Sequence, residues 1–281
     1  MSGLTDLHLH SNRSDGAESP THLVELTADA GVSTMALVDH DVLDGLDEAR
    51  IAAEFHGIQF IPGIELSVDH NGTKMHMLVY FIENKPGPLE AKLAWLREGR
   101  NQRNSQIVKN LNDLGFEITI DDVLRWAAGE SVGRPHIADA LVEMGAVKSR
   151  DEAFDGLLQD GGLAYVERNR LTALEAITLA RDSGGVPVIA HPKTISGGAV
   201  DYAALFAELV DAGLGGIEAH HASHSPELRE HLTTVAHRLG IAATGGSDFH
   251  GNKNRDFRIG VGTGDLRVPE TAVEELLAQR A

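Results

Sequence analysis

Residues 4–10, with the sequence LTDLHLH, alternate polar and apolar side chains from Asp6 onward in the way that is typical of a β-strand. Successive side chains of a strand point to opposite faces, so Asp6, His8 and His10 share one face while the leucines between them pack on the other. Two imidazoles placed in this way can chelate one metal ion. A helical pattern over 21–30 follows, and it makes this stretch the first of a series of strand–helix units.

The same alternation of short apolar runs and helical patterns recurs along most of the chain. The predicted strands after the first are 34–39, 58–66, 74–81, 187–191, 216–219 and 241–245, with a short one near 259–261. The predicted helices after the first are 44–55, 174–183, 202–212, 226–239 and one that begins at Glu270. This order is typical of βα units around a parallel sheet. We expect an α/β fold, and the pattern alone does not distinguish a closed barrel from an open doubly wound sheet.

The alternation of predicted strands and helices stops between Pro86 and about Tyr165, where the pattern is helical. The predicted helices there are 89–114, 120–128, 135–144 and 150–158, and the one candidate strand is 116–119. We therefore predict that residues 1–85 and 166–281 form one barrel-like domain, and that residues 86–165 form a helical insertion that supplies substrate contacts.

The composition of the 281-residue chain excludes several classes of function. It carries 24 Lys and Arg against 42 Asp and Glu, a net charge of −18, which argues against general binding of duplex DNA. A polyanionic substrate would need a local positive site, such as a metal cluster. The absence of cysteine excludes disulfides, thiolate nucleophiles and iron–sulfur ligation. No apolar run approaches the roughly 18 residues of a membrane span, so we expect a cytoplasmic protein with no membrane partner.

Metal-binding side chains gather at or within six of the predicted strands. They are Asp6, His8 and His10 in the first strand, Asp39, His40 and Asp41 after the second, Glu65 in the third, His76 in the fourth, His191 after the fifth, and Asp248 and His250 after the last long one. The carboxyl ends of strands in βα folds form one shared rim. A single histidine there is usually solvated, but so many titratable groups brought together would be costly without cations. The pattern predicts a metal site.

The remaining histidines receive simpler interpretations. We expect His22, His56, His70, His231 and His237 to lie on the surface. Of the cluster His220, His221 and His224, which follows a predicted strand, we expect His221 to face the site.

These residues resemble the PHP (polymerase and histidinol phosphatase) family of metal-dependent phosphoesterases, which are related to the amidohydrolases. The motifs that carry the resemblance are Asp6-Leu7-His8-Leu9-His10-Ser11 with Ser14-Asp15-Gly16, Asp39-His40-Asp41, Pro62-Gly63-Ile64-Glu65, the strand residue His76, Ala190-His191-Pro192 and Gly246-Ser247-Asp248-Phe249-His250. They occur in family order and cover the chain outside the insertion. The insertion resembles that of the subgroup acting on nucleotides, such as nucleoside 3′,5′-bisphosphates, or on short oligonucleotides.

The resemblance implies a distorted (β/α)7 TIM-like barrel with a helical insertion domain and three divalent metal ions (Mn²⁺, Fe²⁺ or Zn²⁺) at the strand ends. The implied ligands are His8, His10, Glu65 and Asp248 for the first ion, Glu65, His76 and His191 for the second, and Asp15, His40 and His250 for the third. It also implies catalytic roles for His8, His10, Glu65, His191 and Asp248. Asp6 is expected to orient a ligand imidazole.

The charge of such a site favours a phosphate substrate. Three divalent ions with three carboxylate ligands leave a charge of about +3, which suits a phosphate monoester dianion. Two ions that share Glu65 would hold a bridging hydroxide that attacks phosphorus in line. We expect a phosphoesterase that acts on a small-molecule phosphate ester: a nucleoside 3′,5′-bisphosphate, a nucleoside monophosphate or a short RNA 5′ end.

Candidate phosphate contacts are Arg134 and His136 at a predicted helix start, Lys193 near the rim, and His221. Arg97, Arg100 and Arg103 recur at threefold spacing, and we interpret them as a solvated helix face. The acid that protonates the leaving group is either His221 or a metal-bound water. The alternatives are a histidinol-phosphate phosphatase, which would share the metal cluster, and a non-catalytic metal-binding module, which the complete ligand set opposes.

Overall fold

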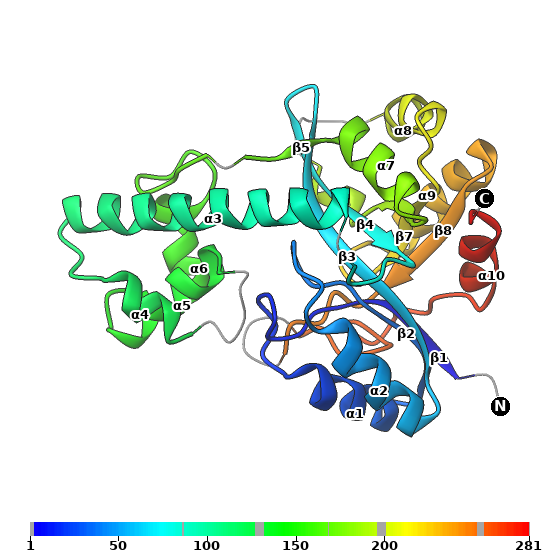
Figure 1. Ribbon diagram of the computed structural model, residues 1–281, viewed down its shortest axis with the longest axis horizontal. Coiled ribbons are helices and arrows are strands. Elements are labelled where there is room, and N and C mark those ends of the chain that lie inside the picture. The colour runs from blue at the N-terminus through cyan, green and yellow to red at the C-terminus, as the bar shows by residue number, and fades with distance from the viewer. Residues whose placement is uncertain are drawn as a thin grey trace.

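The computed structural model describes residues 3–85, 87–126, 132–167, 169–195, 201–251 and 256–280, and its strands curve into a nearly closed barrel (Figure 1). The strands are β1 (Leu4–Leu9), β2 (Val32–Leu37), β3 (Gln59–His70), β4 (Thr73–Tyr80), β5 (Leu171–Thr172), β6 (Val186–Ile189), β7 (Gly216–His221) and β8 (Ala242–Gly246). The helices are α1 (Pro20–Asp29), α2 (Leu46–His56), α3 (Pro88–Asp113), α4 (Ile120–Leu124), α5 (Arg134–Glu143), α6 (Arg150–Ala153), α7 (Ala173–Asp182), α8 (Tyr202–Asp211), α9 (Pro226–Leu239) and α10 (Thr271–Ala278).

The strand order around the barrel is β1-β2-β3-β4-β6-β7-β8, and the short β5 pairs with β3 outside this path. The end of β8 returns to β1, because the His10 amide donates to the Phe249 carbonyl at 3.0 Å and the Asp248 amide to the His8 carbonyl at 2.9 Å. The strands of this path pair in parallel except β4, which is antiparallel to both β3 and β6. The expected α/β, distorted seven-stranded barrel is confirmed, and β4 is its main irregularity.

Most helices begin and end where the sequence predicts. Ser19 and Ser225 accept backbone hydrogen bonds at the starts of α1 and α9, and each is followed by proline, which suits a first helical position. Gly57 and Gly240 follow α2 and α9 with left-handed backbones, with φ of 69° and 72°, as helix ends commonly require.

Four element predictions are wrong. The segment near 259–261 is a turn with an isolated bridge between Arg258 and Gly262, rather than a strand. The segment 116–119 forms no strand and leads into α4. The predicted helix 150–158 ends at Ala153 and continues as a π-type turn, Phe154–Leu158, because Gly156 takes a φ of 78°. The predicted helix 120–128 ends at Leu124, and residues 127 and 128 lie outside the described residues.

The helices from α3 to α6 extend to one side of the barrel (Figure 1). They have a hydrophobic cluster of their own, which includes Ile107, Leu111, Ile137 and Leu141. The barrel has a separate cluster with residues from six of its strands, among them Leu7 and Tyr80. The boundaries at 86 and 165 stay a prediction. None of the described helices combines the length and the apolar character that crossing a membrane requires.

Candidate metal centre

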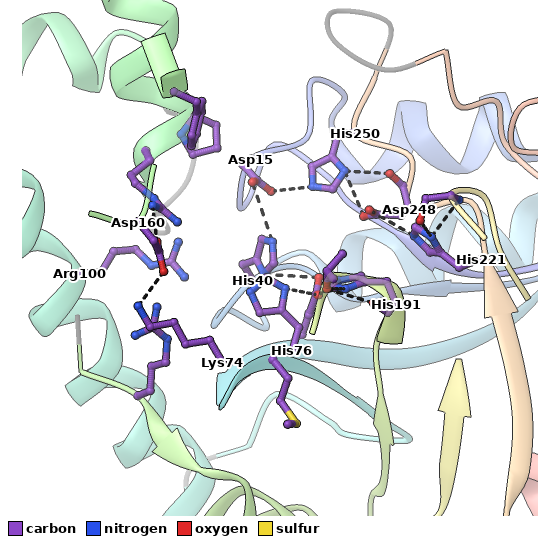
Figure 2. Close-up of a pocket in the computed structure, with 18 of the residues that line it drawn as sticks. Asp15, His40, Lys74, His76, Arg100, Asp160, His191, His221, Asp248 and His250 are labelled. Carbon is purple, nitrogen blue, oxygen red and sulfur yellow. Dashed lines mark hydrogen bonds and ion pairs between the residues drawn. The ribbon is translucent and has the colours of Figure 1, made fainter. Parts of the chain in front are cut away.

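The side chains that the sequence predicts as metal ligands meet at one end of the barrel (Figure 2). His8 and His10 come from β1 and the residue after it, Glu65 and His76 from β3 and β4, and His191 from the residue two after β6. His40, Asp248 and His250 follow β2 and β8, and Asp15 lies in the loop after β1. The carboxyl ends of the parallel strands thus form the rim that the sequence predicts.

Glu65 lies at the centre of this cluster and is 1% exposed. Its Oε2 is 3.2 Å from His8 Nε2 and 3.1 Å from His10 Nε2. Its Oε1 is 2.8 Å from His76 Nδ1 and 3.0 Å from His191 Nε2. His40 Nδ1 lies 3.5 Å from Oε2 as well, so one carboxylate faces five imidazoles, which is the arrangement expected of a ligand shared between ions.

Two aspartates complete the cluster on either side of His250. Asp248 Oδ1 is 3.5 Å from both His8 Nε2 and His10 Nε2, and 3.4 Å from His250 Nδ1. Asp15 lies 3.2 Å from His250 Nε2 and 3.9 Å from His40 Nε2. The carboxylates thus alternate with imidazoles across the rim.

Ligand atoms within 4.8 Å of one another form five overlapping groups. They are His10, Asp15, His40 and His250; His8, Glu65 and His191; His8, His10 and Asp248; His8, Glu218 and His221; and His40, Glu65 and His76. The structure brings all nine predicted ligands into these groups, although it divides them differently from the three predicted sets. His10 also groups with the ligands predicted for the third ion, and His8 with those predicted for the second.

The chemistry of these groups fits divalent cations. His8 Nε2 and His10 Nε2 lie 3.0 Å apart, and both face the same carboxylate oxygen. Buried His10 Nδ1 and His40 Nδ1 have no hydrogen-bond partner among the described residues. Mixed imidazole and carboxylate donors suit Mn²⁺, Fe²⁺ or Zn²⁺.

The pKa values of the cluster show the same need for positive charge. Burial opposes a charge on His10, yet hydrogen bonds with Asp248 and Glu65 raise its pKa to about 10. Burial likewise opposes a charge on Glu65, but the surrounding imidazoles, His40 and His76 foremost, hold its pKa well below the ordinary value. The carboxylates thus attract either protons onto the imidazoles or a cation in their place.

The backbone at the rim is shaped for close approach. A Cβ at Gly246 would lie 2.4 Å from His8 Cβ, so only glycine allows the end of β8 to pack against β1 there. His191 and Asp248 have positive φ angles of 26° and 56°, which are uncommon for residues other than glycine. Such strained positions concentrate at functional sites.

Glu218, which the sequence analysis missed, orients two ligands. It is fully buried in β7, its Oε1 lies 2.8 Å from His8 Nδ1, and its Oε2 accepts the His191 amide at 2.7 Å. A carboxylate behind a ligand imidazole fixes the ring and leaves the other nitrogen for a metal. The available signal was one acid inside the apolar strand segment Gly216-Ile217-Glu218-Ala219.

Asp6 does not have the role that we expected for it. Its carboxylate accepts the backbone amides of His8, Ser247 and Gly260, at 3.3, 2.8 and 2.7 Å. It therefore ties β1 to the segments after β8, and no hydrogen bond to an imidazole is recorded for it among the described residues. The imidazole-orienting role belongs to Glu218.

A row of cations faces the metal ligands across the same cavity, which has a volume of about 710 Å³. We call it the basic wall: Lys74, Arg100, Arg103, Arg134 and Arg170. Lys74 comes from β4, and the arginines come from the insertion and the segment that follows it. Figure 2 shows Lys74 and Arg100 on the opposite side of the cavity from His40 and His76.

The interpretation of Arg97, Arg100 and Arg103 as a solvated helix face is wrong. Arg100 is buried and pairs with Asp41, which follows the ligand His40. Arg103 is also buried, and its Nε donates to the Val166 carbonyl at 2.7 Å. Arg97 is partly buried and pairs with Glu90. Arg100 and Arg103 line the cavity, which helical spacing alone does not reveal.

The predicted phosphate contacts divide into two groups. Arg134 and His221 line the cavity. His136 and Lys193 are not among its described lining residues: His136 Nδ1 accepts the Gly133 amide, and Lys193 Nζ donates to the Ser223 carbonyl at 2.7 Å.

The histidines expected on the surface are exposed with one exception. His22, His56, His231 and His237 are exposed, whereas His70 is buried at the end of β3, where its Nε2 lies 3.2 Å from Glu208.

Comparison with known proteins gives the relatives of this chain. A model of the PHP domain family matches residues 6–118. The chain is 36% identical over 254 residues to a 3′,5′-nucleoside bisphosphate phosphatase of Chromobacterium violaceum, with 89% of each chain covered. It is 30% identical to a phosphoribosyl 1,2-cyclic phosphate 1,2-diphosphodiesterase of Eggerthella lenta, over 95% of this chain and 99% of the relative. It is 33% identical to a 5′-3′ exoribonuclease of Haemophilus influenzae, over 87% of this chain and 89% of the relative.

Solved structures agree with these relatives. A protein of Bifidobacterium adolescentis, assigned provisionally as a metal-dependent phosphoesterase, superposes with a TM-score of 0.89 at 32% identity. The match covers 99% of this chain and 96% of that one.

Proposed function

The chain belongs to the PHP domain family and is a metal-dependent phosphoesterase, and from this premise we propose that it hydrolyses phosphate monoesters of small nucleotides. The proposed substrates are nucleoside 3′,5′-bisphosphates, nucleoside monophosphates and short RNA 5′ ends. The names of the relatives, which include a bisphosphate phosphatase and an exoribonuclease, support this class.

One observation carries the proposal: a single cavity has the metal-ligand cluster on one side and the basic wall on the other. A phosphoryl group at the cluster would leave the rest of the substrate facing cations. In a nucleotide with two phosphates, the second phosphate is negatively charged and complements the positive charge of the basic wall. A volume of about 710 Å³ lies within the range of pockets that hold small ligands.

Arg103 offers an unused buried donor to an anion at the wall. Its Nη2 is buried and has no hydrogen-bond partner among the described residues. Burial, together with the neighbouring charges of Arg134 and Arg100, lowers its pKa to about 10. A buried guanidinium with an unused donor is costly, and a bound oxyanion would remove that cost.

We assign three divalent ions to the ligands His8, His10, Asp15, His40, Glu65, His76, His191, Asp248 and His250. When bound, they supply positive charge to the phosphoryl oxygens and lower the pKa of a water molecule. The chain positions these ligands through the Glu218 and Asp6 contacts described above.

His221 is our candidate for the donor to the leaving group. The Ser223 amide donates to its Nδ1 at 3.1 Å, so a neutral ring carries its proton on Nε2. That Nε2 makes no hydrogen bond among the described residues, its recorded ion-pair contact is Asp248 Oδ2 at 3.4 Å, and the side chain lines the cavity. It can therefore donate to an oxygen of the substrate.

The basic wall disfavours the alternative substrate histidinol phosphate. That molecule carries a protonated amino group, which the cations of the wall would repel. We therefore rank it below the nucleotides.

Phosphate release from a panel of compounds tests the proposal. The panel contains nucleoside 3′,5′-bisphosphates, 3′- and 5′-monophosphates, 5′-phosphorylated short RNA and histidinol phosphate, each with Mn²⁺. We expect nucleotides to be hydrolysed and the variant Asp248→Asn to lose at least about 100-fold in kcat/KM, since it loses a charged ligand. Histidinol phosphate turning over faster than every nucleotide would contradict the proposal, as would full activity of Asp248→Asn. His237→Gln, on the exposed surface, is the matched control.

A further inference from the structure

Asp160 is an acid of the cavity that the metal-ligand groups do not include. The acidic residues that line the described part of the cavity are Asp15, Glu65, Asp160 and Asp248, and the other three belong to those groups. Asp160 follows the π-type turn of the insertion. Its Oδ2 lies 2.7 Å from Lys74 Nζ and its Oδ1 lies 3.0 Å from Arg134 Nη1. Figure 2 shows it among the cations of the basic wall.

This carboxylate joins the insertion to the barrel through ion pairs that are easily broken. Lys74 belongs to β4, whereas Asp160 and Arg134 belong to the insertion. The Asp160 side chain is 45% exposed, and exposed ion pairs contribute little to stability. By contrast, Asp41, which pairs with Arg100, is 3% exposed and is not among the described residues that line the cavity. Glu167 also pairs with Lys74, at 2.9 Å, but it is not among the described residues that line the cavity, so an incoming anion meets Asp160 as the replaceable acid there.

The position of Asp160 is suited to a phosphate. Its two oxygens receive donors from an ammonium and a guanidinium, which are the groups that recognise phosphate monoesters. A phosphate monoester carries nearly two charges at neutral pH, whereas a carboxylate or a phosphodiester carries one. When a phosphate monoester replaces the Asp160 carboxylate, the cations of the wall therefore gain about one negative charge as a partner. When a phosphodiester replaces it, the negative charge beside these cations does not change.

We propose that Asp160 is a specificity-determining residue that occupies the place of a second substrate phosphate between Lys74 and Arg134. A terminal phosphate monoester displaces it, and an internal phosphodiester does not. Asp160 thereby selects substrates whose second phosphate is a chain end. This inference rests on the proposed function for the identity of the substrate, but not for the binding of phosphate at the wall.

Steady-state kinetics with two matched compounds tests the selection. One is a nucleoside bisphosphate, and the other is the same nucleotide with a methyl ester on the phosphate that is not cleaved. We expect the wild-type protein to show the lower KM for the bisphosphate. We define the ratio as the KM for the methyl ester divided by the KM for the bisphosphate. In Asp160→Asn this ratio should fall by about three- to tenfold, because the neutral amide no longer competes with the diester. The effect on KM should exceed the effect on kcat.

The change in the KM ratio distinguishes a role of Asp160 in substrate selection from a purely structural role. If Asp160 only held Lys74 and Arg134 in place, Asp160→Asn would raise the KM for the bisphosphate and leave the ratio unchanged, which would overturn the proposal. Asp160→Ala provides a second variant in which no side-chain donor or acceptor remains. Asp113→Asn breaks an exposed ion pair with Lys109 on the same insertion, outside the cavity, and is the control.

Titration with inorganic phosphate makes the test independent of the substrate. The full chain is freed of metal with a chelator, its fold is checked by circular dichroism, and phosphate binding is measured by calorimetry. We expect Asp160→Asn to bind phosphate about three- to tenfold more tightly than wild type and Asp113→Asn. Unchanged or weaker binding would overturn the role of Asp160. Tighter binding without hydrolysis of any nucleotide would retain that role and reject the proposed function.

Discussion

The contact between His8 and Glu218 decides which nitrogen of His8 faces the cluster. Glu218 Oε1 lies 2.8 Å from His8 Nδ1, so a proton on Nδ1 leaves the lone pair of Nε2 for a cation. Burial opposes the charge of Glu218, but His8 and His221 lower its pKa to about 2, so it remains an acceptor. A single buried acid thus sets the tautomer of a predicted ligand.

The variant Glu218→Gln tests this role. Glutamine keeps the size of the side chain but removes the charge, so we expect metal affinity to fall by about 10- to 100-fold. Metal content by mass spectrometry after dialysis at limiting Mn²⁺ is the measurement. Glu208→Gln is the control, because Glu208 pairs with His70 at 3.2 Å away from the site. Equal metal content in Glu218→Gln and wild type would contradict the assignment.

At the residue scale, strand alternation and position at strand ends were enough to find eight of the nine candidate ligands, whereas Asp15, in the loop after β1, came only from the family resemblance. Glu218 was missed because it is one acid in a short strand and has no partner in the sequence pattern. Asp6 was given the wrong role because alternation shows which face a side chain takes, but not which amide it meets. The burial of Arg100 and Arg103 depends on where α3 lies against the barrel, and this is a tertiary property.

A side chain of the antiparallel strand β4 forms a hydrogen bond with a strand on the opposite side of the barrel. Tyr80, the last residue of β4, is fully buried, and its hydroxyl donates to the Leu7 carbonyl of β1 at 2.9 Å. β1 and β4 are not neighbours in the strand order, so this hydrogen bond crosses the barrel.

Tyr80→Phe should weaken the barrel without changing its chemistry. It removes a buried donor and leaves the Leu7 carbonyl without it, so we expect the free energy of unfolding to fall by about 1–2 kcal/mol. Urea unfolding followed by circular dichroism is the measurement. The control is Tyr202→Phe, whose hydroxyl is only partly buried and makes a longer 3.3 Å bond. A loss no larger than that of the control would show that the bond across the barrel contributes little.

The bounds of helices were predicted well where capping residues mark their ends. They were predicted poorly where an apolar pattern continues past the end of the helix. Ser19-Pro20 and Gly57 are local signals, and α1 and α2 fall within two residues of their predicted bounds. The apolar pattern of 150–158 continues across Gly156, and only the folded backbone shows that the helix ends at Ala153. The sequence analysis expected parallel βα units, so neither the antiparallel direction of β4 nor its place between β3 and β6 was predicted.

The whole molecule combines a net charge of −18 with a basic wall inside its main cavity. Anionic surfaces repel nucleic-acid backbones at long range, so the cations act only on groups that enter the cavity. This separation favours small anionic substrates over long polymers.

Metal removal should make stability depend on pH. Without a cation, the raised pKa of His10, about 10 against 6.5, means that the native state holds a proton which the unfolded chain releases at lower pH. The stabilisation is complete below about pH 6.5 and is lost as the pH rises toward 10. We expect the urea midpoint of chelated protein to fall between about pH 6.5 and 9.5, and to fall less with Mn²⁺. Equal slopes with and without the ion would contradict this.

The return of β8 to β1 also governs when the protein can mature during synthesis. Asp248 and His250 are synthesised long after His8 and His10, because most of the barrel and the whole insertion lie between them in the sequence. Until the end of β8 emerges, β1 keeps one unpaired edge, and the histidines lack the Asp248 carboxylate. A nascent chain therefore lacks part of the candidate ligand set, and β1 keeps an exposed strand edge until the end of β8 has been made.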